Sequence, residues 1–226
     1  GQRLSPGGAF SAIYLSLMST DAPLPRPATR GPSPAKTQRT QAAILDAAMA
    51  EFLEYGVAGA RMDRIARRGG MAKGTPYRYY PTKEALFEGV VQRAMDERNA
   101  LRDTPAFLPG ETLGQHFRRV MLPVAEQLEA SGRASLARLV LAEGGASRFL
   151  AETYFRSIYE PTNAYISAAI RMAIARGEVC DPRLAANPQL LVAPLWVAMV
   201  EGGVLNPGGE ISAASLMELQ ISLFFS

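Results

Sequence analysis

Residues 61–83 constrain the fold of this chain more than any other stretch. An apolar stripe at helical spacing predicts a short helix over about 61–68, with Met62, Ile65 and Ala66 facing inward. Gly69-Gly70 ends that stripe and provides the backbone freedom that a tight turn requires. A second short helix is predicted over about 73–79, and Pro81 ends it. Two short helices joined by a tight turn form a helix-turn-helix, whose second helix enters the major groove of DNA.

The same stretch concentrates positive charge. Residues 61–78 contain six basic residues and one acidic residue, a net charge of +5, whereas the whole chain carries +3. The rest of the chain is therefore slightly acidic. Positive charge gathered on a helix-turn-helix lies where the phosphate backbone of DNA would pass. The charge pattern thus favours nucleic-acid binding by this segment.

Residues 40–87 resemble the N-terminal domain of TetR-family transcriptional regulators. Four colinear motifs carry the resemblance: AAILDAAMAEFLEYG, MDRIA, KGTPYRYY and PTKEALF. The chain departs from the family pattern at Ala60 and Ala72, which lack the side-chain oxygen that would cap a helix, a loss that typically costs about 1 kcal/mol. Pro76 stands where a bulky apolar residue is usual, so we expect a short or frayed second helix.

The predicted DNA contacts lie on and around the second short helix. Arg78 is the best candidate for a base contact, because an arginine can bind guanine through two hydrogen bonds. Tyrosine hydroxyls and lysine amines near the helix ends suit phosphates, and Gly74 lets the backbone approach closely. The resemblance supports the DNA-binding role of the residues given next, except Arg61 and Arg78, for which the prediction depends on the chemistry of the arginine side chain. The predicted DNA-binding residues are Arg61, Lys73, Gly74, Thr75, Tyr77, Arg78, Tyr79 and Lys83.

Helical periodicity without strand-like alternation predicts an all-α fold for the remainder. A first helix is expected over about 40–55, closed by Gly56, and another starts after Thr82. Further helices are expected near 112–130, 133–143, 148–176, 185–204 and 212–225. Pro123 and Pro161 fall inside two of these helices and should kink or split them.

Three regions follow from this pattern. Residues 1–36 include a stretch rich in Pro and Gly and are expected to be a disordered tail. Residues 37–83 are the predicted three-helix DNA-binding head, and the resemblance implies that the helical residues 84–226 form a ligand-binding and dimerisation body. The mildly apolar Arg3–Met18 leaves two alternatives open, a secretory signal or a natural start at Met18.

Composition argues against membrane insertion and metal binding. The apolar run Leu190–Val200 is too short to span a bilayer. The single cysteine, Cys180, cannot form an intrachain disulfide within these residues, and the single histidine, His116, disfavours a zinc site. We expect a cytoplasmic protein with no catalytic residues, no metal and no cofactor.

The body is rich in methionine and aromatic side chains, which are typical of apolar ligand cavities. Such side chains at helical spacing are also ordinary core residues, so both interpretations stay open for each one. The resemblance implies a small-molecule site inside the body, with polar anchors at His116, Glu143, Arg148 or Asn163. The predicted ligand-binding residues are Phe117, Met121, Phe155, Tyr159, Tyr165, Met172 and Trp196.

The last two helices are strongly apolar and would be an aggregation hazard if exposed. A four-helix interface between two subunits would cover them, and the resemblance implies such a homodimer. Intramolecular core is the alternative. The predicted interface residues are Leu191, Leu195, Ala198, Leu216, Leu219 and Leu223.

These features predict a ligand-responsive transcriptional repressor that binds a near-palindromic double-stranded DNA operator as a homodimer and is released by a small, mainly apolar ligand. An activator with the same parts stays open. The alternative from another class is a small-molecule carrier or an enzyme built on a helical bundle. The sequence shows no nucleophile–base pair, carboxylate–histidine metal set or phosphate-cradling loop for an enzyme.

Overall fold

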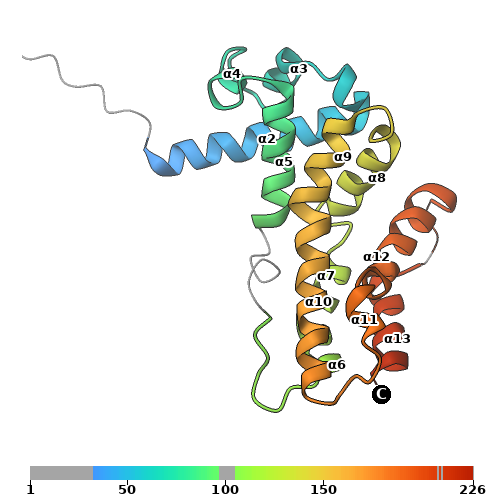
Figure 1. The fold of residues 1–226 in the computed structure, drawn as a ribbon. Helices are drawn as coiled ribbons and strands as arrows, with labels where there is room; N and C mark the ends of the chain where they lie inside the picture. The colour runs from blue at the N-terminus through green and yellow to red at the C-terminus, as the bar shows by residue number, and fades with distance from the viewer. Residues whose placement is uncertain (1–32, 97–104, 208, 210, 226) are drawn as a thin grey trace, which may run out of the picture. The chain divides into compact units, whose positions relative to one another are not determined.

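The computed structural model describes residues 33–96, 105–207, 209 and 211–225, and every regular element within them is helical (Figure 1). The predicted all-α fold is therefore confirmed for the part of the chain that the structure describes. Residues 1–37 and residues 38–226 form two separate compact units. Most of the predicted disordered tail, residues 1–32, lies outside the described residues.

Between residues 33 and 96 the structure describes the helices α2 (Pro34–Gly59), α3 (Met62–Arg68), α4 (Thr75–Tyr79) and α5 (Lys83–Asp96). α2 begins six residues before the predicted start, so Pro34 to Lys36 are helical although they were assigned to the tail. Proline suits the first position of a helix, because the N–H that it lacks would have no partner there. Gly56, with φ 70° and ψ 165°, interrupts α2 where the helix was predicted to end.

The C-terminal part contains the remaining elements: α6 (Leu113–Val120), α7 (Leu122–Glu126), α8 (Arg133–Glu143), α9 (Arg148–Tyr154), the π-helical η2 (Phe155–Tyr159), α10 (Glu160–Ala175), α11 (Arg183–Ala186), α12 (Gln189–Val200), the π-helical η3 (Glu201–Leu205) and α13 (Ala213–Phe224). The expected helix over 112–130 is split at Met121, next to Pro123. The expected helix over 148–176 is interrupted by η2, directly before Pro161 in the first turn of α10. Both prolines therefore act as predicted.

Two clusters of buried apolar side chains hold these helices together. One cluster joins α2 and α5 to the helix-turn-helix and includes Phe52, Ile65 and Phe87, all fully buried. α8 and α9 extend this cluster through Leu136 and Leu150. The second cluster, called here the body core, lies among α6, α7, α10, α12 and α13. The helix-turn-helix thus packs on the body within one compact unit, and the boundary at residue 83 stays a prediction.

Candidate nucleic-acid interface and cavity

The first part of the candidate site is the helix-turn-helix of α3 and α4. As the apolar stripe predicts, α3 buries Met62, Ile65 and Ala66. Gly70 in the turn has φ 62°, a conformation that glycine adopts without steric cost. Pro76 is the second residue of α4, where its missing N–H breaks no intrahelical bond. α4 is five residues long and starts at Thr75, so it is shorter than the expected 73–79.

The N-terminus of α3 is capped by a residue from another helix. The N-cap residue Arg61 makes no side-chain capping bond. Instead, Oε1 of Glu51 in α2 accepts the Arg61 backbone N–H at 3.2 Å and the Nε–H of Arg64 at 2.5 Å. Glu51 is fully buried, and the positive charge of Arg64 compensates its carboxylate. Glu51 therefore satisfies the backbone N–H of Arg61 at the N-cap of α3, although no N-cap side chain caps the helix.

Predicted DNA-binding side chains gather on one surface around α4. Arg61, Lys73, Tyr77 and Lys83 line the same depression, and the first three are exposed. A Cβ atom on Gly74 would meet no atom within 4 Å, so the backbone there is open to approach. This arrangement presents cations and a phenol hydroxyl together, as phosphate contacts require.

The other three predicted residues lie on α4 itself. Arg78 is exposed, and its guanidinium lies 5.2 Å from the centre of the Tyr79 ring. Tyr79 packs partly on the buried cluster, and Thr75 is half-buried in the first turn. Arg78 therefore has the exposure that a base contact needs. The role of all eight residues in DNA binding stays a prediction.

Lys83 has a structural role that the sequence did not indicate. Its Nζ donates hydrogen bonds to the carbonyl oxygens of Val57 (3.1 Å) and Ala58 (2.7 Å). The same residue that follows the break at Gly56 is held from α8, because the Glu143 carboxylate accepts the Val57 N–H at 3.0 and 3.3 Å. A Cβ atom on Gly56 would lie 2.3 Å from Glu143 Oε1, so this contact requires glycine. The end of α2 is thus tied to α5 and to α8.

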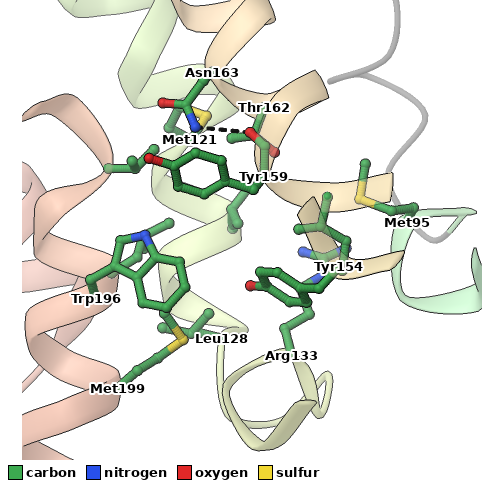
Figure 2. Close-up of a pocket in the computed structure, with 14 residues that line it drawn as sticks. Met95, Met121, Leu128, Arg133, Tyr154, Tyr159, Thr162, Asn163, Trp196 and Met199 are labelled. Atoms are coloured by element: carbon green, nitrogen blue, oxygen red, sulfur yellow. Dashed lines mark hydrogen bonds between the residues drawn. The ribbon is translucent and has the colours of Figure 1, made fainter. Parts of the chain in front are cut away.

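The second part of the candidate site is a cavity in the body, with an empty volume of about 740 Å³ when its open mouth is included (Figure 2). Aromatic, methionine and aliphatic side chains form most of its wall, which is the usual composition of a small-molecule site. The lining residues are Met95, Met121, Val124, Leu128, Arg133, Tyr154, Ile158, Tyr159, Thr162, Asn163, Val192, Leu195, Trp196 and Met199.

Three of the seven predicted ligand-binding residues, Met121, Tyr159 and Trp196, line this cavity. Phe155 and Met172 do not: they are 49% and 36% exposed on the surface. The π-helical turn shifts the register before α10, and Phe155 stacks on the Tyr159 ring, with centroids 5.5 Å apart, without facing the cavity itself. The two other predicted residues, Phe117 and Tyr165, are buried in the body core outside this cavity.

Tyr165 belongs to a buried polar network around His116. Nε2 of His116 lies 2.9 Å from the Tyr165 hydroxyl, and Nδ1 lies 3.1 Å from Oε2 of Glu111. Arg119 donates to both oxygens of Glu111, at 2.6 and 2.8 Å. Burial lowers the pKa of His116, and the hydrogen bonds from Arg119 lower the pKa of Glu111 to about 2. His116 is therefore a structural residue, and it is not a cavity anchor.

Polar side chains also line the cavity, among them Arg133, Thr162 and Asn163. Asn163 was a predicted anchor and does line the cavity, whereas Glu143 and Arg148 do not. The sequence did not predict that Arg133 lines the cavity, because a single arginine at the start of a helix belongs to no periodic pattern. Burial raises the pKa of the lining Tyr154 to about 12, so its hydroxyl stays protonated in neutral solution.

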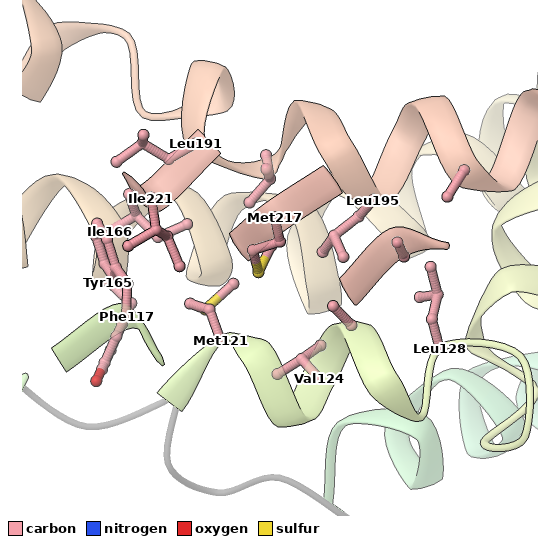
Figure 3. Close-up of a cluster of buried hydrophobic side chains, with 14 of the residues drawn as sticks. Phe117, Met121, Val124, Leu128, Tyr165, Ile166, Leu191, Leu195, Met217 and Ile221 are labelled. Carbon is pink, nitrogen blue, oxygen red and sulfur yellow. The ribbon is translucent and has the colours of Figure 1, made fainter. Parts of the chain in front are cut away.

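The predicted subunit interface is only partly exposed. Leu191, Leu195 and Ala198 of α12 are at most 8% exposed and lie in the body core, where Leu191 and Leu195 appear with Met217 and Ile221 (Figure 3). Leu216 is half-buried, whereas Leu219 and Leu223 of α13 are 56% and 70% exposed. The exposed apolar side chains of both helices, called here the outer face, are Leu190, Val197, Leu219, Leu223 and Phe224.

The described residues show neither a cluster of metal ligands nor a membrane-spanning helix. None of them forms a group of three or more His, Cys, Asp or Glu side chains able to hold a metal ion. Within the same residues, no helix combines the length and the apolar character needed to cross a bilayer.

The chain resembles known regulators in sequence. Residues 44–90 match the family model described as bacterial regulatory proteins, tetR family. The HTH-type transcriptional repressor SCO4008 of Streptomyces coelicolor is 45% identical over 58 residues, which are 26% of this chain and 30% of that protein. The match thus spans less than a third of this relative.

Solved structures extend the likeness over most of the chain. The flavonoid-responsive regulator FrrA is 26% identical, with a TM-score of 0.58 over 83% of this chain and 95% of that chain. The transcriptional regulator FadR of Bacillus subtilis, in complex with stearoyl-CoA, is 18% identical, with a TM-score of 0.64 over 82% of this chain and 97% of that chain. Residues 44–90 therefore resemble the helix-turn-helix domain of the tetR family, and the described part of the chain shares the fold of these solved regulators.

Proposed function

We propose that the chain is a ligand-responsive repressor that binds a near-palindromic operator as a homodimer. The observation that carries this proposal is the exposed surface around α4, where Arg61, Lys73, Tyr77 and Arg78 point outward on one helix-turn-helix. In the proposed division, residues 37–83 bind DNA, and residues 84–226 bind the ligand and the second subunit. The relative SCO4008, which is named as a repressor, supports this direction of regulation.

The outer face supports a homodimer. Five large apolar side chains of α12 and α13 are each at least 45% exposed there. Two copies of this face, packed around a two-fold axis, would bury them in a four-helix interface. A two-fold dimer presents two copies of α4 to successive major grooves, and this symmetry predicts a near-palindromic operator.

The cavity supports control by a small ligand. FrrA is named as flavonoid-responsive, and the FadR structure contains stearoyl-CoA, so one fold serves unlike ligands. The lining of this cavity, with Trp196, two tyrosines and three methionines, fits a small and mainly apolar compound. Such a compound would release the operator if it binds a dimer conformation that does not fit DNA.

Selection of DNA from a random-sequence pool tests the proposal. The wild-type protein should enrich one near-palindromic motif, and Arg78→Ala should lose preference at a single position in each half-site. Recovery of no motif by a folded protein would contradict the operator-binding proposal. A thermal-shift screen with aromatic and aliphatic compounds tests the ligand part separately, and the absence of any stabilising compound would contradict that part alone.

A further inference from the structure

The π-helical turn η2 brings two tyrosines to the cavity. Tyr154 is the last residue of α9, and Tyr159 is the last residue of η2. In an α-helix, residues three or four apart share a face, whereas the i→i+5 hydrogen bonds of a π-helix place residues five apart above one another. Both tyrosines accordingly line the cavity. Because π-turns are frequent at functional sites, this distortion of the helix supports a binding role for the cavity.

Trp196 of α12 completes an aromatic wall with the two tyrosines. Its ring centroid lies 6.3 Å from that of Tyr154 and 6.5 Å from that of Tyr159, with interplanar angles of 69° and 59°. Edge-on and tilted arrangements of this kind are favourable between aromatic rings. In Figure 2 the three side chains border the open space. A flat aromatic compound in the cavity can therefore contact more than one of these rings.

Each ring of this wall carries a polar group that makes no hydrogen bond to another described residue. These groups are the hydroxyls of Tyr154 and Tyr159 and the indole N–H of Trp196. All three stay accessible, in contrast to Oδ1 of Asn163, which is sealed and also has no partner. The polar ends of tyrosine and tryptophan usually find a partner when the ring is buried. A few polar groups that project from an apolar wall are what orients a ligand in a small-molecule site.

The surroundings of Tyr154 disfavour a negative charge. Burial raises the pKa of its hydroxyl to about 12, and the positive charge of Arg133 offsets only part of this rise. The same loss of hydration acts on a ligand atom next to this hydroxyl, so an uncharged oxygen is favoured there over an anionic one. In neutral solution Tyr154 keeps its proton and can donate it to such an oxygen.

We propose that the cavity binds an uncharged aromatic compound whose ketone or hydroxyl oxygen accepts hydrogen bonds from the Tyr154 hydroxyl and the Trp196 indole N–H. The inference rests on the proposed function, in which this cavity holds the effector, and it names the chemical class of that effector. The indole N–H can only donate, so the compound has to present an acceptor, and one such oxygen has lone pairs for both donors. The rings of the compound pack on the aromatic wall and leave water, while the oxygen fixes their orientation.

Three naphthalene derivatives of one shape test the oxygen and its charge. 2-Acetylnaphthalene carries a ketone oxygen, 2-isopropenylnaphthalene has a methylene group in its place, and 2-naphthoate carries a carboxylate. Equilibrium dialysis measures the affinity of each compound for the full chain. Trp196, the single tryptophan of the chain, lines the cavity, so quenching of its emission shows that a compound binds there. The wild-type protein should bind the ketone more tightly than the carboxylate.

Two altered proteins each remove one donor and keep the shape of its ring. Tyr154→Phe removes the hydroxyl, and benzothienylalanine incorporated in place of the single tryptophan replaces the indole N–H by sulfur. Each change should lower the affinity for the ketone about threefold to tenfold and alter that for the hydrocarbon by less than about twofold. Tyr55→Phe is the matched control, because Tyr55 is 46% exposed on α2 and does not line the cavity, so neither affinity should change.

Thermal unfolding without ligand checks that the two donors are vacant. Because neither group has a partner in the described structure, neither change should lower the melting temperature. A clearly lower melting temperature of Tyr154→Phe would mean that its hydroxyl is bonded within the protein, and this result overturns the inference.

The binding data separate failure of the inference from failure of the proposed function. An unchanged ketone affinity in either altered protein, or equal losses for ketone and hydrocarbon, overturns the inference and leaves the proposed cavity intact. Tighter binding of 2-naphthoate than of the ketone by the wild-type protein overturns it as well. If the wild-type protein binds none of the three compounds, the inference fails, and the proposed effector cavity fails with it only if the wider thermal-shift screen also finds no stabilising compound.

Discussion

Replacing Leu219 by alanine should weaken the homodimer without unfolding the subunit. Leu219 is 56% exposed in the subunit, so the proposed interface buries up to that share of the side chain. The change removes three carbons, each contributing about 0.8 kcal/mol when fully buried, and two-fold symmetry places two copies in the interface. The expected loss is about 2.7 kcal/mol per dimer, equal to roughly a 100-fold rise in the dissociation constant.

Leu195→Ala is the matched control, because Leu195 lies on the inner side of α12 and is 8% exposed. It should lower the free energy of unfolding by about 2–5 kcal/mol and leave the dissociation constant of the folded protein nearly unchanged. Sedimentation equilibrium over a range of concentrations measures dissociation, and thermal unfolding measures stability. A Leu219→Ala dimer as tight as wild type, or a wild-type protein that is monomeric at high micromolar concentration, would show that the outer face is not a subunit interface.

Three further predictions address DNA binding, acid stability and the link between α2 and α8. Arg78→Ala should cost about 1–3 kcal/mol on the preferred operator and little on shuffled DNA, and unchanged discrimination in binding isotherms would exclude base reading. Acid should destabilise the fold in two stages, because the pKa of buried His116 is lowered and that of Glu111 is about 2. Each of these residues takes up its proton at a higher pH in the unfolded chain than in the folded one. The free energy of unfolding should therefore fall as pH drops below about 6.5, because of His116, and again below about 4.5, because of Glu111. Urea unfolding at a series of pH values measures this free energy, and the His116→Gln variant should lack the first of the two stages. A free energy of unfolding that does not change between pH 4 and 7 would contradict the prediction. Glu143→Ala leaves a backbone N–H after Gly56 without its acceptor and should cost about 1–3 kcal/mol in thermal unfolding, whereas an unchanged melting temperature would show that the contact adds no stability.

Local sequence signals were sufficient for most of the helices. The stripe in α3, the glycine turn and Pro81 predicted the helix-turn-helix within one or two residues, because each signal acts on adjacent backbone. Pro123 and Pro161 likewise interrupt helices near the predicted places. The early start of α2 at Pro34 was missed, because the preceding residues have the composition of a disordered segment.

The inner and outer sides of α12 could not be distinguished by sequence. Its residues QLLVAPLWVAMV are apolar on every side of the helix, so no stripe marks the buried face. Leu191 and Leu195 therefore looked like interface residues, although they lie in the body core, whereas Leu190 and Val197 are the exposed ones. The sequence predicted that these residues form a helix, but which side of the helix is buried depends on packing against helices that are distant in the sequence.

Contacts between residues that are distant in the sequence could not be predicted either. His116 meets Tyr165 across 49 residues, and Arg133 meets Ala94 across 39. Neither pair shares a helix, so no spacing rule relates them. The polar side of the cavity, at Arg133 and Asn163, consequently emerged only from the structure, whereas its aromatic side at Tyr159 and Trp196 was predicted from residue type.

Occupancy of the cavity should control DNA binding. The operator affinity, measured with and without a compound that quenches Trp196, tests this control. Saturating compound should weaken operator binding by about 5- to 150-fold, and operator should weaken binding of the compound by the same factor. Both affinities are accessible by calorimetric titration of the free protein and of the operator complex. An operator affinity unchanged by saturating compound would contradict the claim.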